Sequence, residues 1–526
     1  MSDRRRWFGL PFIALGVALI IVDSTIVNVA IPSIIDDLGV TSTQAQWVQE
    51  TYTLVFASLL LVFGRIADRT GRRAMFALGV LIFAASSVLA ATVDSGNALI
   101  AARLVQGVGG AMMLPTSLSI LNSTFFGKDR GIAFAVWGST IGAAAAFGPL
   151  LGGWLTTSFS WRWAFGINIP LGIVILVGLF LFVNESRSTE EASGADFLGA
   201  FLSVVGIGSI VFGLIEGRNY GWFTSLEAVE LPGFTWDFSI SIVPVAFLLG
   251  ASMLALFIKV EVDRNRAGKA VLLDLRLLGI PSFRNANIAA AIVSLGEFGL
   301  LFALPLWLQN VLGYSAFETG LILLALALGS FVASGAGAAV GNSKGPVFVV
   351  RTGIVLEILG IAISGVVIAI DTPWWLICLP LFVYGAGVGL ATAQLTGVAL
   401  ADVPIENSGQ GSGITSTTRQ LGSALGIAIL GTILFSSLGN DFSQRLEAFP
   451  QIPAAARSEL TNTVVQSAGA VIPGFMADPQ NQAVGIAASE ALTYGTKLAA
   501  FVGAGFLVLG WLATLRLGSS RPQRTE

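Results

Sequence analysis

The chain contains no histidine, a single cysteine and few charged residues. Without histidine it has no His-dependent metal site, no Ser-His-Asp or Cys-His triad, and no side chain that ordinarily titrates near neutral pH. Cys378 stands alone in an apolar stretch, where it can form neither an intrachain disulfide nor a CxxC site and is expected to be a small buried hydrophobic residue. Any proton transfer must therefore use carboxyl groups.

Charge is scarce over the whole length of 526 residues. Charged residues make up 11% of the chain, against about 25% in a typical soluble protein, whereas 54% of the residues are hydrophobic. The net charge is -3 and no long basic stripe occurs, so the sequence gives no indication of a nucleic-acid partner. This composition predicts a membrane protein.

Apolar runs long enough to cross a hydrocarbon core of ~30 Å recur along the chain. The first run follows a basic N-terminus and shows no small-residue cleavage site, so it is expected to remain as a membrane span. We expect fourteen spans, at 8–31, 46–67, 74–93, 97–122, 131–157, 164–184, 196–216, 238–260, 285–307, 316–340, 347–370, 374–400, 411–436 and 490–516.

The basic residues indicate how these spans are oriented. With an even number of spans both termini lie on one side, and most of the 28 Lys and Arg residues fall in loops on that side. Cytoplasmic loops carry such an excess. The sequence therefore predicts a multi-pass protein of the cell (cytoplasmic) membrane with both termini in the cytoplasm, and leaves Arg103 and Arg419 as the basic residues inside spans.

Glycine patterns repeat at an offset of eight spans, which is a signature of many transporters. The glycine-rich stretches of spans four and five recur in spans twelve and thirteen, and the loop after span two has a thinner counterpart after span ten. We expect two six-helix bundles, at 1–190 and 271–526, separated by two inserted spans and a linker at 191–270. The segment 217–237 is expected to be an outside loop. The long outside segment 437–489 is either a solvated loop or contains a short amphipathic helix near 453–468.

Four motifs are specific enough to carry a resemblance. They run from Asp23 to Pro32 in span one, Gly64 to Arg73 after span two, Arg103 to Gly109 in span four, and Gly142 to Gly153 in span five. Supporting matches are Gln46-Trp47, Trp161 to Pro170, Leu308-Gln309 and Arg419 to Gly422. Over essentially its whole length the chain resembles the major facilitator superfamily, and within it the fourteen-span drug:proton antiporter family of the multidrug efflux type.

This resemblance implies an all-α membrane protein with the major facilitator fold. It further implies a proton-coupled antiporter that works by alternating access, exports hydrophobic and cationic drugs, and confers antibiotic resistance. The expected partners are a small-molecule substrate, protons and membrane lipid. The protein is expected to be a monomer, not to be an enzyme, and to use no cofactor or metal. The family also contains dedicated exporters of one metabolite, lipid or self-made antibiotic, and this alternative stays open because family membership fixes mechanism better than cargo.

Charged side chains inside spans are costly and therefore mark candidate sites. Asp23 lies about fifteen residues into span one and is either a proton or cation site or a structural acid held by Arg103 or by hydrogen bonds. Arg103 is either a fixed positive charge that acts on a nearby carboxyl group or a structural residue. Glu297 and, with less support, Glu357 are candidate proton-coupling acids of the second bundle, on the basis of burial alone.

A second group of residues is expected to contact the substrate. Arg419 shares a helical face with small residues, as Arg103 does, and either contacts a carboxylate across the bundle or extends to the cytoplasmic surface. Aromatic rings inside spans suit flat cationic molecules. The expected substrate cavity comprises Asp23, Asn28, Tyr52, Gln106, Glu297, Tyr384 and Arg419.

Gating is assigned to two glycine-containing segments. Asp68 can cap a helix of the facing bundle while neighbouring arginines bind carboxylates or lipid phosphates, which forms a latch that must break for opening. Pro149 removes a backbone hydrogen bond from span five and bends it. The expected gating residues are Gly64, Asp68, Arg69, Gly71, Arg72, Gly148, Pro149 and Gly152.

Other classes of membrane protein fit the sequence less well. An ATP-driven pump would need a phosphate-binding loop, and the chain has none. A membrane prenyl transferase would need clustered acidic metal ligands, but Asp36-Asp37 is the one adjacent pair of aspartates. A receptor without transport would not need the paired glycine motifs.

Overall fold

The computed structural model of the chain describes residues 3–40, 42–187, 196–226, 228–231 and 234–517, together with most of their side chains. Within these residues, thirteen helices are long and apolar enough to cross a membrane, and a bent helix makes a fourteenth. The expected fourteen spans are thereby confirmed. The spanning helices are α1 (Asp3–Leu38), α2 (Ser42–Thr70), α3 (Arg72–Thr92), α4 (Gly96–Thr124), α5 (Gly127–Ser158), the pair α6 (Arg162–Gly166) and α7 (Asn168–Phe182), α8 (Phe197–Tyr220), α9 (Ile242–Arg266), α10 (Pro281–Asn310), α11 (Ala316–Lys344), α12 (Pro346–Val367), α13 (Trp374–Leu400), α14 (Ser408–Leu446) and α17 (Gln482–Ala513).

Local sequence explains several helix starts. The Ser95 side chain accepts a hydrogen bond from the Ala98 backbone at the start of α4, and Ser315 and Glu318 form a reciprocal capping box at the start of α11. Gly71 precedes α3 with φ 119°, and Gly345 precedes α12 with φ 89°. Both conformations favour glycine, and they occur at corresponding loops of the two halves, as the repeat in the sequence predicts.

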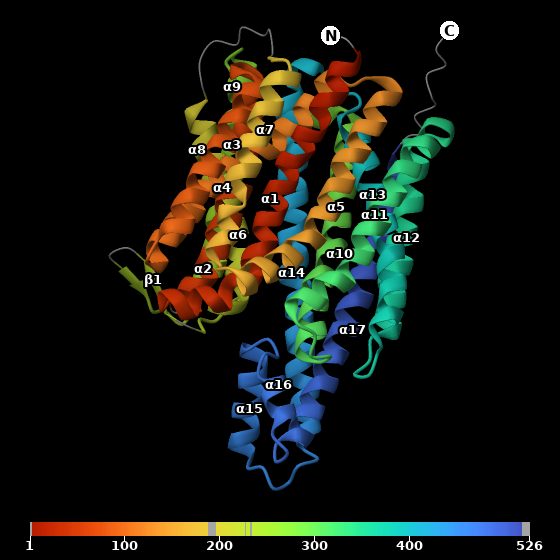
Figure 1. Cartoon of the computed structure of the whole chain (residues 1–526). Helices are drawn as coiled ribbons and strands as arrows, with labels where there is room; N and C mark the ends of the chain where they lie inside the picture. The colour runs from red at the N-terminus through yellow and green to blue at the C-terminus, as the bar shows by residue number, and fades with distance from the viewer. Residues whose placement is uncertain (1–2, 41, 188–195, 227, 232–233, 518–526) are drawn as a thin grey trace.

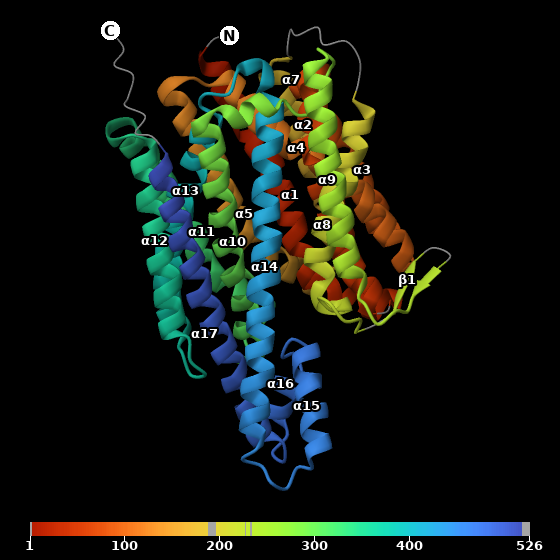
Figure 2. The ribbon, with the colours of Figure 1, turned by 180° about the vertical axis from the view of Figure 1, so that it is seen from behind.

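The helices form two bundles with an additional helix pair, which confirms the expected fold class. Helices α1–α7 pack together, α10–α14 pack with α17, and α8 and α9 pack on each other beside α2 and α14 (Figure 1; Figure 2, from behind). The main contacts between the bundles are those of α5 with α11 and of α2 with α14. Helix α1 begins and α17 ends at the same end of the molecule, here called the terminal end (Figure 2).

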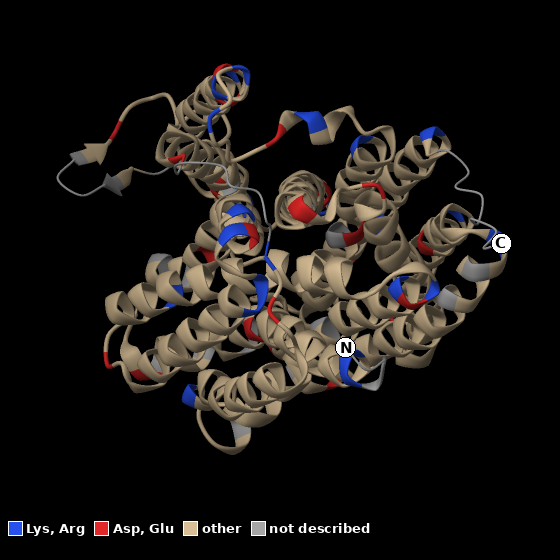
Figure 3. Cartoon of the chain, turned by 90° about the horizontal axis from the view of Figure 1, so that it is seen from above, with Lys and Arg blue, Asp and Glu red and all other residues tan. Residues whose placement is uncertain are grey.

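Charge is confined to particular places in this arrangement. Viewed from the terminal end, Lys, Arg, Asp and Glu lie at helix ends and in connecting loops, whereas the helices are mostly uncharged (Figure 3). This is the distribution that a hydrocarbon environment requires.

Small residues allow close contact between the bundles. A Cβ atom added at Gly142 of α5 would lie 2.7 Å from Ser330 Oγ of α11, and one added at Gly138 would lie 2.8 Å from Ala393 Cβ of α13. Helices in lipid associate largely through such packing.

Helix α5 is bent, as Pro149 predicts. The segments Gly127–Ala144 and Phe147–Thr156 meet at 40°. Proline lacks the N–H that would bond to the carbonyl four residues earlier, and its ring collides with that carbonyl. The position of the bend, four residues before Pro149, has this physical cause.

The segment 437–489 is a helical projection rather than an extended loop. Helix α14 continues past the expected span end at 436 to Leu446, and α17 begins at Gln482 rather than at 490. Between them lie α15 (Ala454–Gln466), where the alternative of a short helix near 453–468 is realised, and α16 (Ile472–Ala477) (Figure 1). A separate apolar core that includes Phe442, Val464 and Ile472 holds the projection together. The polar composition of the segment gave no indication in the sequence that it contains an apolar core.

The other expected outside loop, 217–237, also contains regular structure. Helix α8 extends to Tyr220, and β1 (Val229–Leu231) pairs antiparallel with β2 (Phe234–Trp236), with Val229 opposite Trp236. Spans, bundles and connections otherwise follow the expected order.

The contact between α5 and α1 yields a stability prediction. A Cβ atom at Gly148 would collide with Thr25 Oγ1, whereas nothing lies within 4 Å of a Cβ at Gly131 of the same helix. Gly148→Ala should therefore lower the free energy of unfolding by roughly 1–3 kcal/mol, and Gly131→Ala should not. Thermal melting of the two detergent-solubilised variants checks this, and equal melting temperatures would contradict it.

Candidate functional site

The first buried polar cluster surrounds Asp23 of α1. Asp23 is fully buried, and its carboxylate is 2.5 Å from Arg103 Nη1 of α4. Gln106 Nε2 and Asn168 Nδ2 each donate to Asp23 Oδ1 at 2.7 Å. Donors from two other helices thus converge on one carboxylate, which is the arrangement that a buried charge needs.

Arg103 also makes a hydrogen bond and a cation–π contact with residues of a third helix. Its Nε donates to the backbone oxygen of Val48 at 3.0 Å, and its guanidinium lies 4.3 Å from the ring centroid of Tyr52. Both residues belong to α2. A cation over an aromatic face is stabilised by the ring's negative face, so Tyr52 stabilises Arg103 in this structure.

Two members of this cluster were not among the expected site residues. Asn168 donates to Asp23, and Ser87 Oγ accepts from Gln106 at 2.9 Å and from Asn168 at 3.2 Å. Asn168 lies within the motif Trp161 to Pro170, and an amide in an apolar span was the available signal. Ser87 had no comparable signal, because serine is common in transmembrane helices.

The second cluster lies in the other bundle, around Glu297 of α10. Glu297 is buried, and its carboxylate lies 3.9 Å from Arg419 Nη2 of α14 and accepts from Thr392 Oγ1 of α13 at 3.3 Å. The Tyr384 hydroxyl donates to the Glu297 backbone oxygen at 2.9 Å. Of the alternatives for Arg419, the structure therefore has the carboxylate contact rather than an extended, surface-directed side chain.

Glu357 of α12 differs from the other acids. It is fully buried, packs beside Gly387 of α13, and neither of its carboxylate oxygens has a hydrogen-bond partner among the described residues. An unpartnered ionised carboxylate in apolar surroundings is very costly. Glu297 and Arg419 are the charged residues that act on it electrostatically.

A third polar contact joins the two bundles at the terminal end. The Asp68 carboxylate of α2 accepts hydrogen bonds from the backbone N–H groups of Gly409 at 2.8 Å and Gln410 at 3.0 Å. These groups belong to the first turn of α14, whose N–H groups have no partner within the helix. Asp68 therefore caps a helix of the opposite bundle, as the latch hypothesis requires.

Neighbouring groups reinforce this gate contact, defined as Asp68, Arg72 and the first turn of α14. Arg72 donates to Asp68 at 2.8 Å and to the Ile405 backbone oxygen at 2.6 Å. Gly64 is close enough to α14 that an added Cβ would collide with the Gly409 backbone oxygen. Asn122 of α4 also reaches across, donating to Ser408 Oγ at 2.9 Å.

The remaining expected gating residues take different places. Gly71 starts α3 beside Glu185, Arg69 is half-buried next to the gate contact, and Gly148 and Gly152 pack against Thr25 and Ile26 of α1. These two glycines of α5 therefore contact α1 within the first bundle, close to Asp23 along the chain.

Another carboxylate of α1, Asp37, lies beyond the membrane-spanning part. It is exposed, forms an ion pair with Arg162, and accepts from the Trp161 indole at 3.0 Å. The hydrogen bonds from Arg162 and Trp161 lower the pKa of Asp37. This residue is a natural comparison for the buried Asp23.

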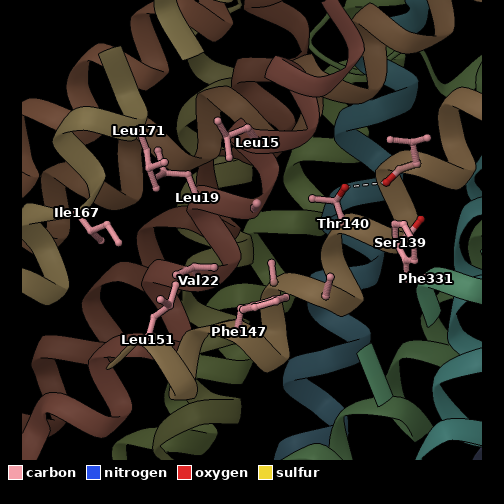
Figure 4. Close-up of a pocket in the computed structure, with 14 residues that line it drawn as sticks. Leu15, Leu19, Val22, Ser139, Thr140, Phe147, Leu151, Ile167, Leu171 and Phe331 are labelled. Atoms are coloured by element: carbon pink, nitrogen blue, oxygen red, sulfur yellow. Dashed lines mark hydrogen bonds between the residues drawn. The ribbon is translucent and has the colours of Figure 1, made fainter. Parts of the chain in front are cut away.

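A cavity of about 360 Å³ lies among α1, α5, α7 and α11 (Figure 4). Its walls are apolar except for Ser139 and Thr140, whose hydroxyls donate to backbone oxygens of their own helix. Leu19, Val22 and Phe147 are among its lining residues. Of the expected substrate-contact residues whose side chains the structure describes, none lines this cavity.

The structure thus groups the expected site residues into two clusters rather than one. Asp23, Arg103, Gln106 and Tyr52 lie together in the first bundle. Glu297, Tyr384 and Arg419 lie together in the second, with Glu357 close by. The side chain of Asn28 lies outside the described part of the structure.

Three comparisons bear on this arrangement. The model of the Major Facilitator Superfamily matches residues 13–427. A "Probable actinorhodin transporter" of Streptomyces coelicolor is 33% identical over 87% of this chain and 76% of its own length. The "Multidrug resistance protein Stp" of Mycobacterium tuberculosis is 29% identical over 98% of this chain and 92% of its own length.

The fold also has a solved counterpart. The human organic anion transporter MFSD10 (TETRAN) superposes with a TM-score of 0.61 at 14% identity, covering 98% of this chain and 100% of that one. At this identity the likeness concerns the fold alone.

The gate contact yields a prediction about access. In a Cys378→Ser background, a cysteine introduced at the fully buried Ser412, one turn beyond Ser408 on α14, reports opening of this end. Asp68→Asn should raise its reaction rate with N-ethylmaleimide in detergent roughly five-fold or more, because the charge on the cap is lost.

The matched control is Asp402→Asn at the same end of the molecule. Asp402 accepts a hydrogen bond from Ser282 of its own bundle and does not cap a helix of the other. The labelling rate of this variant should equal that of the parent, and an equal increase in both variants would contradict the latch.

Proposed function

The chain belongs to the Major Facilitator Superfamily, and on that premise we propose that it is a proton-coupled antiporter that exports hydrophobic, cationic compounds by alternating access. In this proposal it functions as a monomer in the cytoplasmic membrane, with both termini in the cytoplasm. The basic residues of the terminal-end loops support this orientation. The proposed domain boundaries at 190 and 270 fall between α7 and α8 and between α9 and α10.

The fully buried Asp23–Arg103 pair is the observation that carries the proposal. One carboxylate in a dry site has room for one positive partner at a time, because a second would leave an uncompensated charge. A proton on Asp23 would neutralise it and release Arg103, and a substrate cation would compete with both. This competition is the physical basis for exchange of a proton for a cation.

The second bundle supports a coupled role for its own acids. Glu297 shares a cluster with Arg419, and Glu357 is buried without a partner among the described residues. We assign Glu297 and Glu357 to proton coupling in this half. We assign to the substrate path the residues that surround Asp23 and Glu297, namely Tyr52, Gln106, Tyr384 and Arg419. Asn28 is assigned to it because it lies on α1, as Asp23 does.

Alternating access needs a gate that forms and breaks. In the proposed cycle the gate contact at Asp68 closes the cytoplasmic side, and its loss opens that side. The bend of α5 and its glycine contacts with α1 allow the first bundle to adjust near Asp23.

The similar proteins support drug export and are consistent with two kinds of cargo. A multidrug resistance protein is similar over nearly the whole chain, which favours broad drug export. A probable actinorhodin transporter is similar over most of it, which favours a dedicated exporter of one compound. The apolar cavity among α1, α5 and α7 is compatible with either.

Asp23→Asn tests the proton site. Efflux driven by a pH gradient in vesicles should fall to background, because an amide does not exchange a proton in this range. Asp37→Asn makes the same change at an exposed position of the same helix and should keep efflux within roughly two-fold of the parent. Immunoblots of the membrane fraction and thermal melting establish that both variants fold. Normal coupled efflux by Asp23→Asn would refute the assignment.

Cargo breadth calls for a separate measurement. Cells that express the chain should expel ethidium, and a protonophore should abolish this efflux, since it collapses the proton gradient. Export of a single metabolite with no dye efflux would establish the dedicated exporter instead. Dye efflux that persists with the protonophore would exclude proton coupling.

A further inference from the structure

A pair of acidic side chains lies in the inserted helices, outside both clusters described above. Glu261 is fully buried in the last turns of α9, and Asp196 is buried immediately before α8. Neither belongs to a motif that carries the family resemblance.

The two carboxyl groups face each other. Glu261 Oε2 accepts from the Leu273 backbone at 3.1 Å, and Asp196 Oδ1 accepts from the Gly199 backbone at 2.8 Å. Among the described residues, the other two oxygens, Glu261 Oε1 and Asp196 Oδ2, accept no hydrogen bond, although Asp196 Oδ2 forms an ion pair with Arg264. A Cβ added at Gly199 would collide with Glu261 Oε1 and lie 2.5 Å from Asp196 Oδ2, so these two oxygens converge on one point.

One positive charge, Arg264, is in contact with this acid pair through Asp196. Arg264 Nε lies 3.2 Å from Asp196 Oδ2, and the same guanidinium donates to the Ala270 backbone oxygen at 2.9 Å and 2.7 Å. An ionised Asp196 is thereby balanced. A second ionised carboxylate facing it would be uncompensated, whereas a protonated Glu261 would donate its proton to Asp196 Oδ2.

Among the described residues, the immediate surroundings of the pair are largely apolar. Leu61 and Val62 of α2, Leu202 of α8 and Phe257 of α9 form an apolar cluster with Leu272 and Leu273. Charged groups on the elements packed around the pair include, in the described residues, Arg65, Asp68 and Arg69 of α2, Lys259, Asp263 and Arg266 of α9, and Lys269, Asp274 and Arg276 of the linker. From α14, the uncharged Gln410 contacts the linker.

The linker between α9 and α10 connects this pair to the gate contact. The backbone N–H of Leu273 donates a hydrogen bond to Glu261, and the backbone oxygen of Val271 accepts one from Arg65 of α2 at 3.2 Å. The backbone N–H of Asp274 donates to the side-chain oxygen of Gln410 of α14 at 2.8 Å. The Gln410 backbone in turn donates to Asp68. Five consecutive linker residues, 270–274, thus bridge the acid pair and both helices of the gate.

We propose that Glu261 and Asp196 form a proton-binding site that holds this gate closed while Glu261 is protonated. Loss of the proton from Glu261 Oε1 to water on that side leaves two facing carboxylates with one guanidinium. Their repulsion loosens the linker and, through Val271 and Asp274, the contacts of α2 with α14. The site gives the inserted helices a role in the cycle, and its place in transport rests on the proposed alternating access.

Labelling of the thiol introduced by Ser412→Cys, in the Cys378→Ser background, tests the site without any transport assay. From about pH 6 to about pH 9, its reaction rate with N-ethylmaleimide, corrected for thiolate formation with a model thiol, should rise roughly five-fold or more. Glu261→Gln mimics the protonated acid and should keep the low rate throughout. Asp196→Asn removes the second carboxylate, so loss of the proton from Glu261 creates no repulsion, and this variant should also keep the low rate throughout.

Glu216→Gln is the matched control, because Glu216 is a buried acid of α8 that hydrogen-bonds with Asn219 away from the linker. It should follow the parent curve. A flat parent curve, or a Glu261→Gln curve that rises like the parent, would overturn the proposal. If Glu261→Gln does not fold, an Asp196→Asn curve that rises like the parent curve would overturn it equally. Loss of dye efflux with an intact labelling curve would count against the transport function alone.

Discussion

A full charge inside a hydrocarbon layer is tolerated only beside an opposite charge or a set of hydrogen-bond donors. In the described structure each such pair lies within one bundle. Asp23 is neutralised by Arg103 in the first half, and Glu297 lies beside Arg419 in the second. The bundles can therefore change their mutual position without separating either of these two buried ion pairs.

The contacts between the bundles have a different character. They consist of close approaches at small residues, such as Gly142 with Ser330, and of hydrogen bonds at a helix start, where Asp68 receives the N–H groups of Gly409 and Gln410. Small side chains do not interdigitate deeply between neighbouring helices, so the helices can separate without large side-chain rearrangements. The N–H groups of a first helical turn can also form hydrogen bonds with water. Contacts of this kind are suited to breaking and re-forming.

The inserted helices take part in the same arrangement. Their linker is hydrogen-bonded to Glu261, to Arg65 and to Gln410, so α8 and α9 are attached to the place where the bundles meet rather than lying apart in the lipid. The acid pair they carry resembles the clusters of the bundles in one respect: a buried carboxylate lies beside a single arginine.

The sequence by itself determined the number of spans, the two-bundle repeat and the bend at Pro149, because apolar length, glycine spacing and the missing proline N–H act locally. It also singled out Asp23, Arg103, Asp68 and Glu297 as unusual. It did not reveal Ser87 and Asn168 as partners of Asp23, the Glu261–Asp196 pair, or the apolar core inside 437–489. Those depend on side chains that are distant along the chain, and only the packing of helices decides which of them meet.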